Sequence, residues 1–169
     1  MNENHDYLKQ EAFWTVLRDW FDAMAGNLGQ RARLRRAKEP FEVFISPAMQ
    51  RDLRIRLIQA GFPLSIQALE RLALGIGVAS HAKALLGEGH FARQLARADK
   101  GGQDVRDVRF RRLLAVEDRE ELYTMLVRLV RYLDGVVHLE SLIKGTYWWN
   151  EKTRREWAMH YFTVTDAHE

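Results

Sequence analysis

Apolar residues recur at steps of three and four along almost the whole chain, which places them on one face of each successive α-helix. The first such stripe consists of Leu8, Phe13, Val16, Leu17, Trp20, Phe21 and Met24. Asn-Gly or Asp-Gly turns between two segments of alternating apolar and polar residues are typical of short β-hairpins. The sequence contains no such arrangement. The sequence therefore predicts an all-α protein.

Glycine, proline and capping residues divide this pattern into a two-lobed bundle of about eight to nine helices. Gly26 can end the first helix. Ile58 and Val108 are expected to face inward from later ones. The residues suited to N-caps are Ser65, Asp104, Asp118 and Asn150. The expected helices cover residues 7–25, 30–37, 48–59, 66–86, 90–98, 105–115, 119–134, 139–147 and 151–162.

The length of 169 residues suits one compact domain. A chain of this size buries roughly 70% of the surface that it exposes when unfolded. Glycine-rich turns at 87–89 and 101–102 separate an N-terminal helical half (7–86) from a C-terminal helical half (90–165). Both halves carry too much apolar surface to be independent, so we expect a single domain over residues 1–169.

The sequence offers little support for catalysis, cofactor binding or a metal site. It has no Cys, which excludes thiol catalysis and Cys-ligated metals. His138-x-Glu140 lacks the Cys half of a deaminase motif, so His138 is better explained as a helix-entry residue. Gly75 and Gly77 lie within a predicted helix without a preceding strand, which favours close helix packing over dinucleotide binding. We expect a non-enzyme without cofactors; a helical enzyme with a metal site gathered from distant segments is a remaining alternative.

Nothing in the chain predicts a membrane partner. The start, Met1 to Asp6, is polar and acidic, unlike a secretory signal peptide. The longest uncharged apolar stretch, Leu72 to Ala79, is far shorter than the ~20 residues of a membrane span. A cytoplasmic location is expected.

Positive charge is concentrated in two segments, although the net charge is only +3. Residues 1–29 hold two basic and five acidic side chains, residues 30–60 eight basic and three acidic, and residues 93–112 seven basic and three acidic. Of the 26 basic residues, 20 are Arg, the side chain best suited to gripping phosphates. A genome-wide preference for Arg is the alternative explanation of this count.

The basic residues also share helix faces. Arg93 and Arg97 are four apart, Arg128 and Arg131 are three apart, and unopposed like charges at these spacings repel unless an anion neutralises them. The other groups are Arg106, Arg109 and Arg112, and Arg31, Arg33, Arg35, Arg36 and Lys38. The pattern predicts a surface that binds a polyanion. A helical adaptor whose basic patches meet acidic proteins, without binding nucleic acid, is the alternative.

The tryptophans are divided between core and surface. Trp14, Trp20 and Trp157 lie on inward stripes, so we expect them in the core. Trp148 and Trp149 are consecutive and cannot both point inward from one helix, so one of them is a candidate for a protein interface.

An ordered set of motifs from about residue 14 to 165 resembles the CasB family, the small subunit of the type I-E CRISPR surveillance complex, Cascade. The upstream motifs are Leu34-Arg35-Arg36-Ala37-Lys38-Glu39-Pro40 and Phe91-Ala92-Arg93-Gln94-Leu95-Ala96. The downstream motifs are Arg109-Phe110-Arg111-Arg112-Leu113-Leu114, Leu126 to Leu133, Leu139 to Leu142, Tyr147-Trp148-Trp149, Arg154-Arg155-Glu156-Trp157-Ala158 and Tyr161-Phe162. Departures from the family pattern are Ala92, where Gly is usual, and the loop Lys100–Asp107.

The resemblance implies an all-helical, non-catalytic subunit, present in two copies between the large subunit and the RNA-holding backbone subunits of Cascade. It implies a basic surface that binds the R-loop, chiefly the displaced non-target DNA strand. Arginine contacts to the backbone would serve DNA or RNA. The nucleic-acid contacts that it implies are Arg35, Arg36, Arg93, Arg109, Arg112, Arg128, Arg131 and Lys144.

Overall fold

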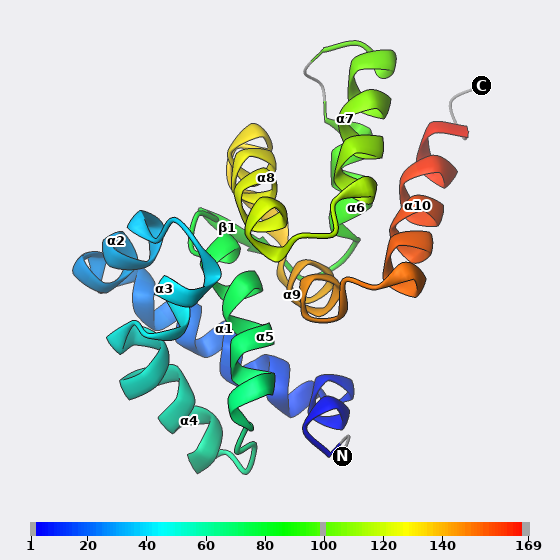
Figure 1. Cartoon of the computed structure of the whole chain (residues 1–169). Helices are drawn as coiled ribbons and strands as arrows, with labels where there is room; N and C mark the ends of the chain where they lie inside the picture. Colours follow the sequence, from blue (N-terminus) through cyan, green and yellow to red (C-terminus); the bar gives the residue numbers. More distant parts are fainter. Residues whose placement is uncertain (1–2, 99–100, 167–169) are drawn as a thin grey trace.

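The computed structural model describes residues 3–98 and 101–166, of which about three quarters are helical (Figure 1). The all-α class is confirmed, with one two-stranded sheet in the described residues. None of the described helices is long and apolar enough to cross a bilayer. The elements are η1 (Glu3–Lys9), α1 (Glu11–Ala25), α2 (Leu28–Arg36), α3 (Pro40–Phe44), η2 (Ala48–Leu53), α4 (Arg54–Gln59), α5 (Ile66–Ala79), β1 (Ala84–Leu86), α6 (Phe91–Arg97), α7 (Gln103–Ala115), α8 (Arg119–Tyr132), β2 (Val136–His138), α9 (Leu139–Trp148) and α10 (Glu151–Asp166).

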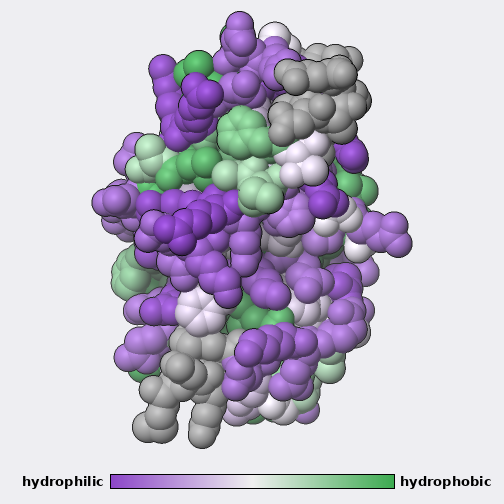
Figure 2. Space-filling view, turned by 90° about the vertical axis from the view of Figure 1, so that its right-hand side faces the viewer, coloured by the Kyte–Doolittle hydropathy of each residue, from purple (hydrophilic) through white to green (hydrophobic). Residues whose placement is uncertain are grey.

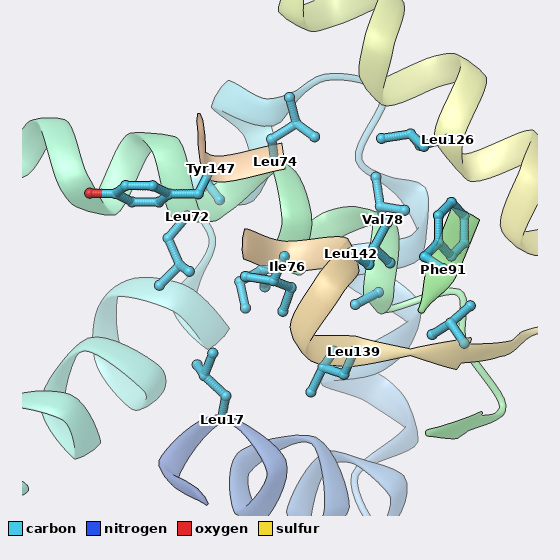
Figure 3. Close-up of a cluster of buried hydrophobic side chains, with 14 of the residues drawn as sticks. Leu17, Leu72, Leu74, Ile76, Val78, Phe91, Leu126, Leu139, Leu142 and Tyr147 are labelled. Atoms are coloured by element: carbon cyan, nitrogen blue, oxygen red, sulfur yellow. The ribbon is translucent and has the colours of Figure 1, made fainter. Parts of the chain in front are cut away.

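Helix α5 is the centre of the arrangement. It packs against α3, α8 and α9, while α6 packs against α10 on the far side of α9 (Figure 1). Figure 3 shows Leu72 and Ile76 of α5 within one cluster that also contains Leu139 and Leu142 of α9. The core is continuous from Leu8 to Tyr161, so both helical halves contribute to it.

Two glycines of α5 permit this close packing. A Cβ atom at Gly75 would lie 2.6 Å from Thr146 Oγ1 and 3.0 Å from the backbone Cα of Ile143 in α9. A Cβ atom at Gly77 would lie 2.6 Å from Val43 Cγ2 in α3 and 2.8 Å from the Tyr123 ring in α8. The sequence-based interpretation of both glycines as close-packing residues is confirmed.

The long helix predicted over 66–86 is wrong beyond Ala79. The chain turns there, and Ala84–Leu86 forms β1, which pairs in parallel with β2 in the register Ala84↔Val136. The backbone amides of Lys83 and Ala84 both donate to the Gly135 carbonyl, at 2.7 and 3.2 Å. Gly135 has φ +76°, and a Cβ there would lie 3.0 Å from the Lys83 amide. The partner strand is about fifty residues away in the sequence, so local periodicity could not reveal it.

Other local predictions had mixed outcomes. Ser65, Asp118 and Asn150 accept hydrogen bonds from Ala68, Glu121 and Thr153 amides as N-caps. The Asp104 cap is wrong because α7 begins earlier, at Gln103, with Gly102 as its N-cap. The first half of the predicted helix 48–59 is a π-helix, η2.

The predicted core is largely correct. Trp14, Trp20 and Trp157 are buried as expected. Trp149 is also buried, beyond the end of α9, and its Nε1–H donates to the Val116 carbonyl at 2.8 Å, whereas Trp148 is half-buried. Ile58 and Val108 do not face inward, since they are 43% and 47% exposed.

Adding a methyl group at either α5 glycine is expected to destabilise the protein. Overpacking costs about 1–3 kcal/mol, and alanine recovers at most about 1 kcal/mol through helix propensity. Gly75→Ala and Gly77→Ala should therefore each lower the free energy of unfolding, measured by urea denaturation. Gly29→Ala in α2 is the matched control, because its Cβ would meet nothing closer than 3.7 Å. Equal stability of all three variants would contradict the packing argument.

Candidate nucleic-acid interface

Two arginines of α2 hold the C-terminal end of α5. Arg35 Nε donates to the Ser80 carbonyl at 2.8 Å. Arg31 Nε donates to the same carbonyl at 3.4 Å, and its guanidinium also binds the Ala82 carbonyl. The last carbonyls of a helix lack partners within the helix and carry partial negative charge, so cations are favourable there. These bonds fix both side chains in half-buried positions.

His81 lies where α2 and α8 come together. It is 7% exposed, and its Nε2 has no hydrogen-bond partner in the described part of the chain. Burial lowers the pKa of His81 to about 4, with further lowering from the positive charges of Arg131, Arg35 and Arg31. Arginines from two helices are therefore close enough to act on one imidazole, which is neutral at pH 7.

The C-terminal half of α8 continues this basic surface. Arg128 and Arg131 are both exposed, and Tyr132 lies four residues after Arg128, on a neighbouring part of the helix surface. The Arg109 guanidinium of α7 lies over the Tyr132 ring, 4.4 Å from its centroid. Arg109 is therefore half-buried and oriented by stacking, while Arg112, one turn further along α7, is exposed.

Six of the eight predicted contact residues lie on three helices, α2, α8 and α7, and we call this set the arginine track: Arg35, Arg36, Arg131, Arg128, Arg109 and Arg112. Two contacts link these helices: the Tyr123 hydroxyl of α8 donates to the Ala37 carbonyl at the end of α2, at 2.9 Å, and Arg109 of α7 stacks on Tyr132 of α8. Arg31 binds the same Ser80 carbonyl as Arg35 but was not among the predicted contacts. The four-residue spacing of Arg31 and Arg35, which places both side chains on one face of α2, could have identified it in the sequence.

No carboxylate forms an ion pair with a track arginine among the side chains of residues 6–98 and 101–163. The ion pairs there join Asp6 to Lys9, Glu11 to Arg18, Asp52 to Arg56 and Glu151 to Arg155. Asp107, on the track's own helix α7, accepts a hydrogen bond from the Tyr161 hydroxyl at 2.8 Å instead. The described side chains therefore do not neutralise the positive charge of the track by ion pairs.

The remaining two predicted contacts lie elsewhere. Arg93 of α6 lies near His90 and His160 and contributes to lowering the pKa of both. Lys144 of α9 lines a groove beside α10. Lys100, which added to the basic character of segment 93–112, is outside the described residues.

The histidines whose side chains the structure describes do not assemble a metal site. The imidazoles of His90 and His160 stack at 3.9 Å between centroids, an arrangement of ring faces rather than of converging nitrogens. His138 caps α9, accepting from the Ser141 amide at 3.2 Å, as its predicted helix-entry role requires. No group of three His, Cys, Asp or Glu side chains among the described residues could hold a metal ion.

Comparisons with known proteins converge on one family. The model of the CRISPR-associated protein Cse2 family matches residues 30–162. One chain of the crystal structure of E. coli Cascade bound to a PAM-containing dsDNA target has a similar fold, with a TM-score of 0.66. The similarity covers 91% of this chain and 96% of that chain at 20% identity, which establishes a shared fold. A search of curated proteins found no significant match.

Acid is expected to destabilise the fold through His81. Its pKa is about 4 in the folded state against an ordinary 6.5, so below pH 6.5 the unfolded chain binds a proton that the folded chain does not. Stability should then fall as the pH drops from 6.5 to 4, by about 3 kcal/mol from this residue. His81→Gln should remove that part of the pH dependence in urea denaturation series. Parallel curves for the two proteins would exclude a buried neutral His81.

Proposed function

The chain belongs to the CRISPR-associated Cse2 family, the non-catalytic small subunit of type I-E Cascade, and we propose that its arginine track holds the displaced DNA strand of an R-loop. The same proposal places the protein in the cytoplasm, in two copies, beside the large subunit and the backbone subunits. The fold relative comes from a Cascade bound to double-stranded DNA, which supports DNA as the polyanion.

The observation that carries the proposal is that α8 contacts both α2 and α7, through the Tyr123–Ala37 hydrogen bond and the Arg109–Tyr132 stack, and that the arginines of these helices in the track have no carboxylate ion-pair partner among the described side chains. Arginine forks suit phosphate oxygens, and half-buried, oriented side chains lose little freedom on binding. Arg35 and Arg109 are of this kind, since each is already held by a protein contact.

A modest affinity for the displaced strand is sufficient to favour the open R-loop. Replacing a DNA duplex by a guide–target heteroduplex is a nearly balanced exchange, so a ligand for the released strand shifts it towards the open state. Because backbone contacts carry no base information, sequence preference should be slight. The same contacts would accept single-stranded RNA, which makes RNA the natural comparison in binding assays.

Neutralising two track residues should weaken strand binding and its salt dependence together. If one copy neutralises about four phosphates, the slope of log affinity against log salt is about −3 for a single strand. Arg128→Gln combined with Arg131→Gln should reduce its magnitude by about 1.4. Fluorescence anisotropy with labelled single strands, at several salt concentrations, measures both quantities.

The matched control is Arg155→Gln combined with Lys152→Gln, which removes the same charge from α10, away from the track. This control should leave the slope unchanged. Equal losses in both double variants would show that net charge, not the track, governs binding. A protein that binds no strand at low salt yet assembles normally into Cascade would support the adaptor alternative instead.

A further inference from the structure

A large groove on the α10 side of the molecule is separate from the arginine track. It has a volume of about 890 Å³ and lies between η1, α9 and α10, with Arg71 of α5 and His90 also on its wall. Figure 2 faces this side and shows hydrophilic residues surrounding smaller pale and hydrophobic areas. We call it the α9–α10 groove.

Aromatic rings form part of its inner surface. The stacked His90–His160 pair packs against the buried Trp157, whose ring is 5.9 Å from His90 at an angle of 88°. Half-buried Trp148 lines another part, and the Arg71 guanidinium lies 5.6 Å from its ring centroid. Burial, followed by nearby positive charge, lowers the pKa of His90 to about 3, so this imidazole is neutral at pH 7.

The ionised residues that line the groove have both signs. The basic members are Lys9, Arg71, Lys144 and Lys152, and the acidic members are Asp6, Glu140 and Glu156. Lys9 and Asp6 pair with each other at 3.3 Å, which leaves three basic and two acidic residues without an ion pair among the described residues. The arginine track, by contrast, has no ion pair between its arginines and a carboxylate among the side chains of residues 6–98 and 101–163.

This difference in charge favours different occupants for the two surfaces. A nucleic-acid strand presents only negative charge, so in the groove its phosphates would approach Glu140 and Glu156. Like charges placed together at an interface are costly, whereas a polypeptide can oppose both signs. Exposed parts of Trp and Arg side chains, as at Trp148 and Arg71, are also the usual anchors of protein interfaces.

We propose that the α9–α10 groove docks a polypeptide segment of a neighbouring Cascade subunit, one that carries both acidic and basic side chains and an apolar or aromatic anchor. The anchor packs against Trp148 and the His90–His160 pair, and the charged side chains pair with Lys144, Lys152 and Glu156. This proposal depends on membership of Cascade and not on strand binding by the track. It assigns Lys144 to a protein contact.

Opposite charge reversals in the groove test the proposal. Lys144→Glu and Glu156→Lys would be compared during reconstitution of Cascade from the subunits of the same source. Each reversal breaks a pairing with the segment, so each should weaken retention of the chain in the purified complex by about tenfold. Trp148→Ala should weaken retention as well. Binding of a labelled single strand by the isolated chain should stay within about twofold of the unmodified protein for all three.

Glu117→Lys is the matched control, since it reverses one exposed carboxylate that does not line the groove. Thermal unfolding of every variant shows whether the fold is intact; for any variant that unfolds, Lys144→Gln, Glu156→Gln or Trp148→Phe takes its place. Strand binding tightened by Glu156→Lys and weakened by Lys144→Glu would overturn the proposal and place nucleic acid in the groove. Unchanged retention, or reversals that alter only self-association of the isolated chain, would also overturn it. If the track variants fail to affect strand binding but the groove variants lose retention, only the proposed function fails.

Discussion

The close approach of α5 to its neighbours is the constraint on which the rest of the structure depends. Without side chains at Gly75 and Gly77, α9 packs on one part of α5 while α3 and α8 pack on another. The C-terminal ends of α5 and α8 consequently meet, and the Gly135 carbonyl joins them by binding the Lys83 and Ala84 amides. The free carbonyls at the end of α5 then bind Arg31 and Arg35. The same packing that closes the core therefore also brings the basic residues of α2 and α8 together.

Much of the fold could be predicted from the sequence, because helix periodicity and capping are local properties. The caps at Ser65, Asp118 and Asn150 depend on residues three positions away, and they form as predicted. The β1–β2 pairing depends on segments far apart in the chain, and it was missed. The arginine spacing identified shared helix faces but not how those faces combine. It could not show that α8 contacts both α2 and α7, or that Arg93 and Lys144 lie elsewhere.

The cationic side chains of this protein differ in how far they are already organised. Arg35 is bound to a helix carbonyl and Arg109 is stacked on Tyr132, whereas Arg112, Arg128 and Arg131 are exposed. Ordering a long side chain on binding costs about 0.5–1.5 kcal/mol. The held arginines have lost part of this freedom already on folding, so they define where a phosphate backbone would lie, and the exposed ones can adjust to it. The buried His81 is neutral at pH 7, so it adds no further positive charge beside Arg31 and Arg35.

The arginine track and the α9–α10 groove differ in charge composition, and therefore in the kind of partner that each can bind. The arginine track attracts any phosphate backbone, including that of closed duplex DNA. A track with many more phosphate contacts would therefore bind the duplex before it opens. About four phosphate contacts give salt-sensitive binding that is weak for one copy. Weak binding is nevertheless enough to shift a nearly balanced strand exchange. Such a weak grip acts only if the subunit is held beside the strand by something else, because linkage converts a weak contact into an intramolecular one. A groove with both charge signs and an aromatic lining supplies a surface of the kind that holds proteins. In the proposed arrangement, protein docking provides the affinity, and the arginines provide the bias towards the open state.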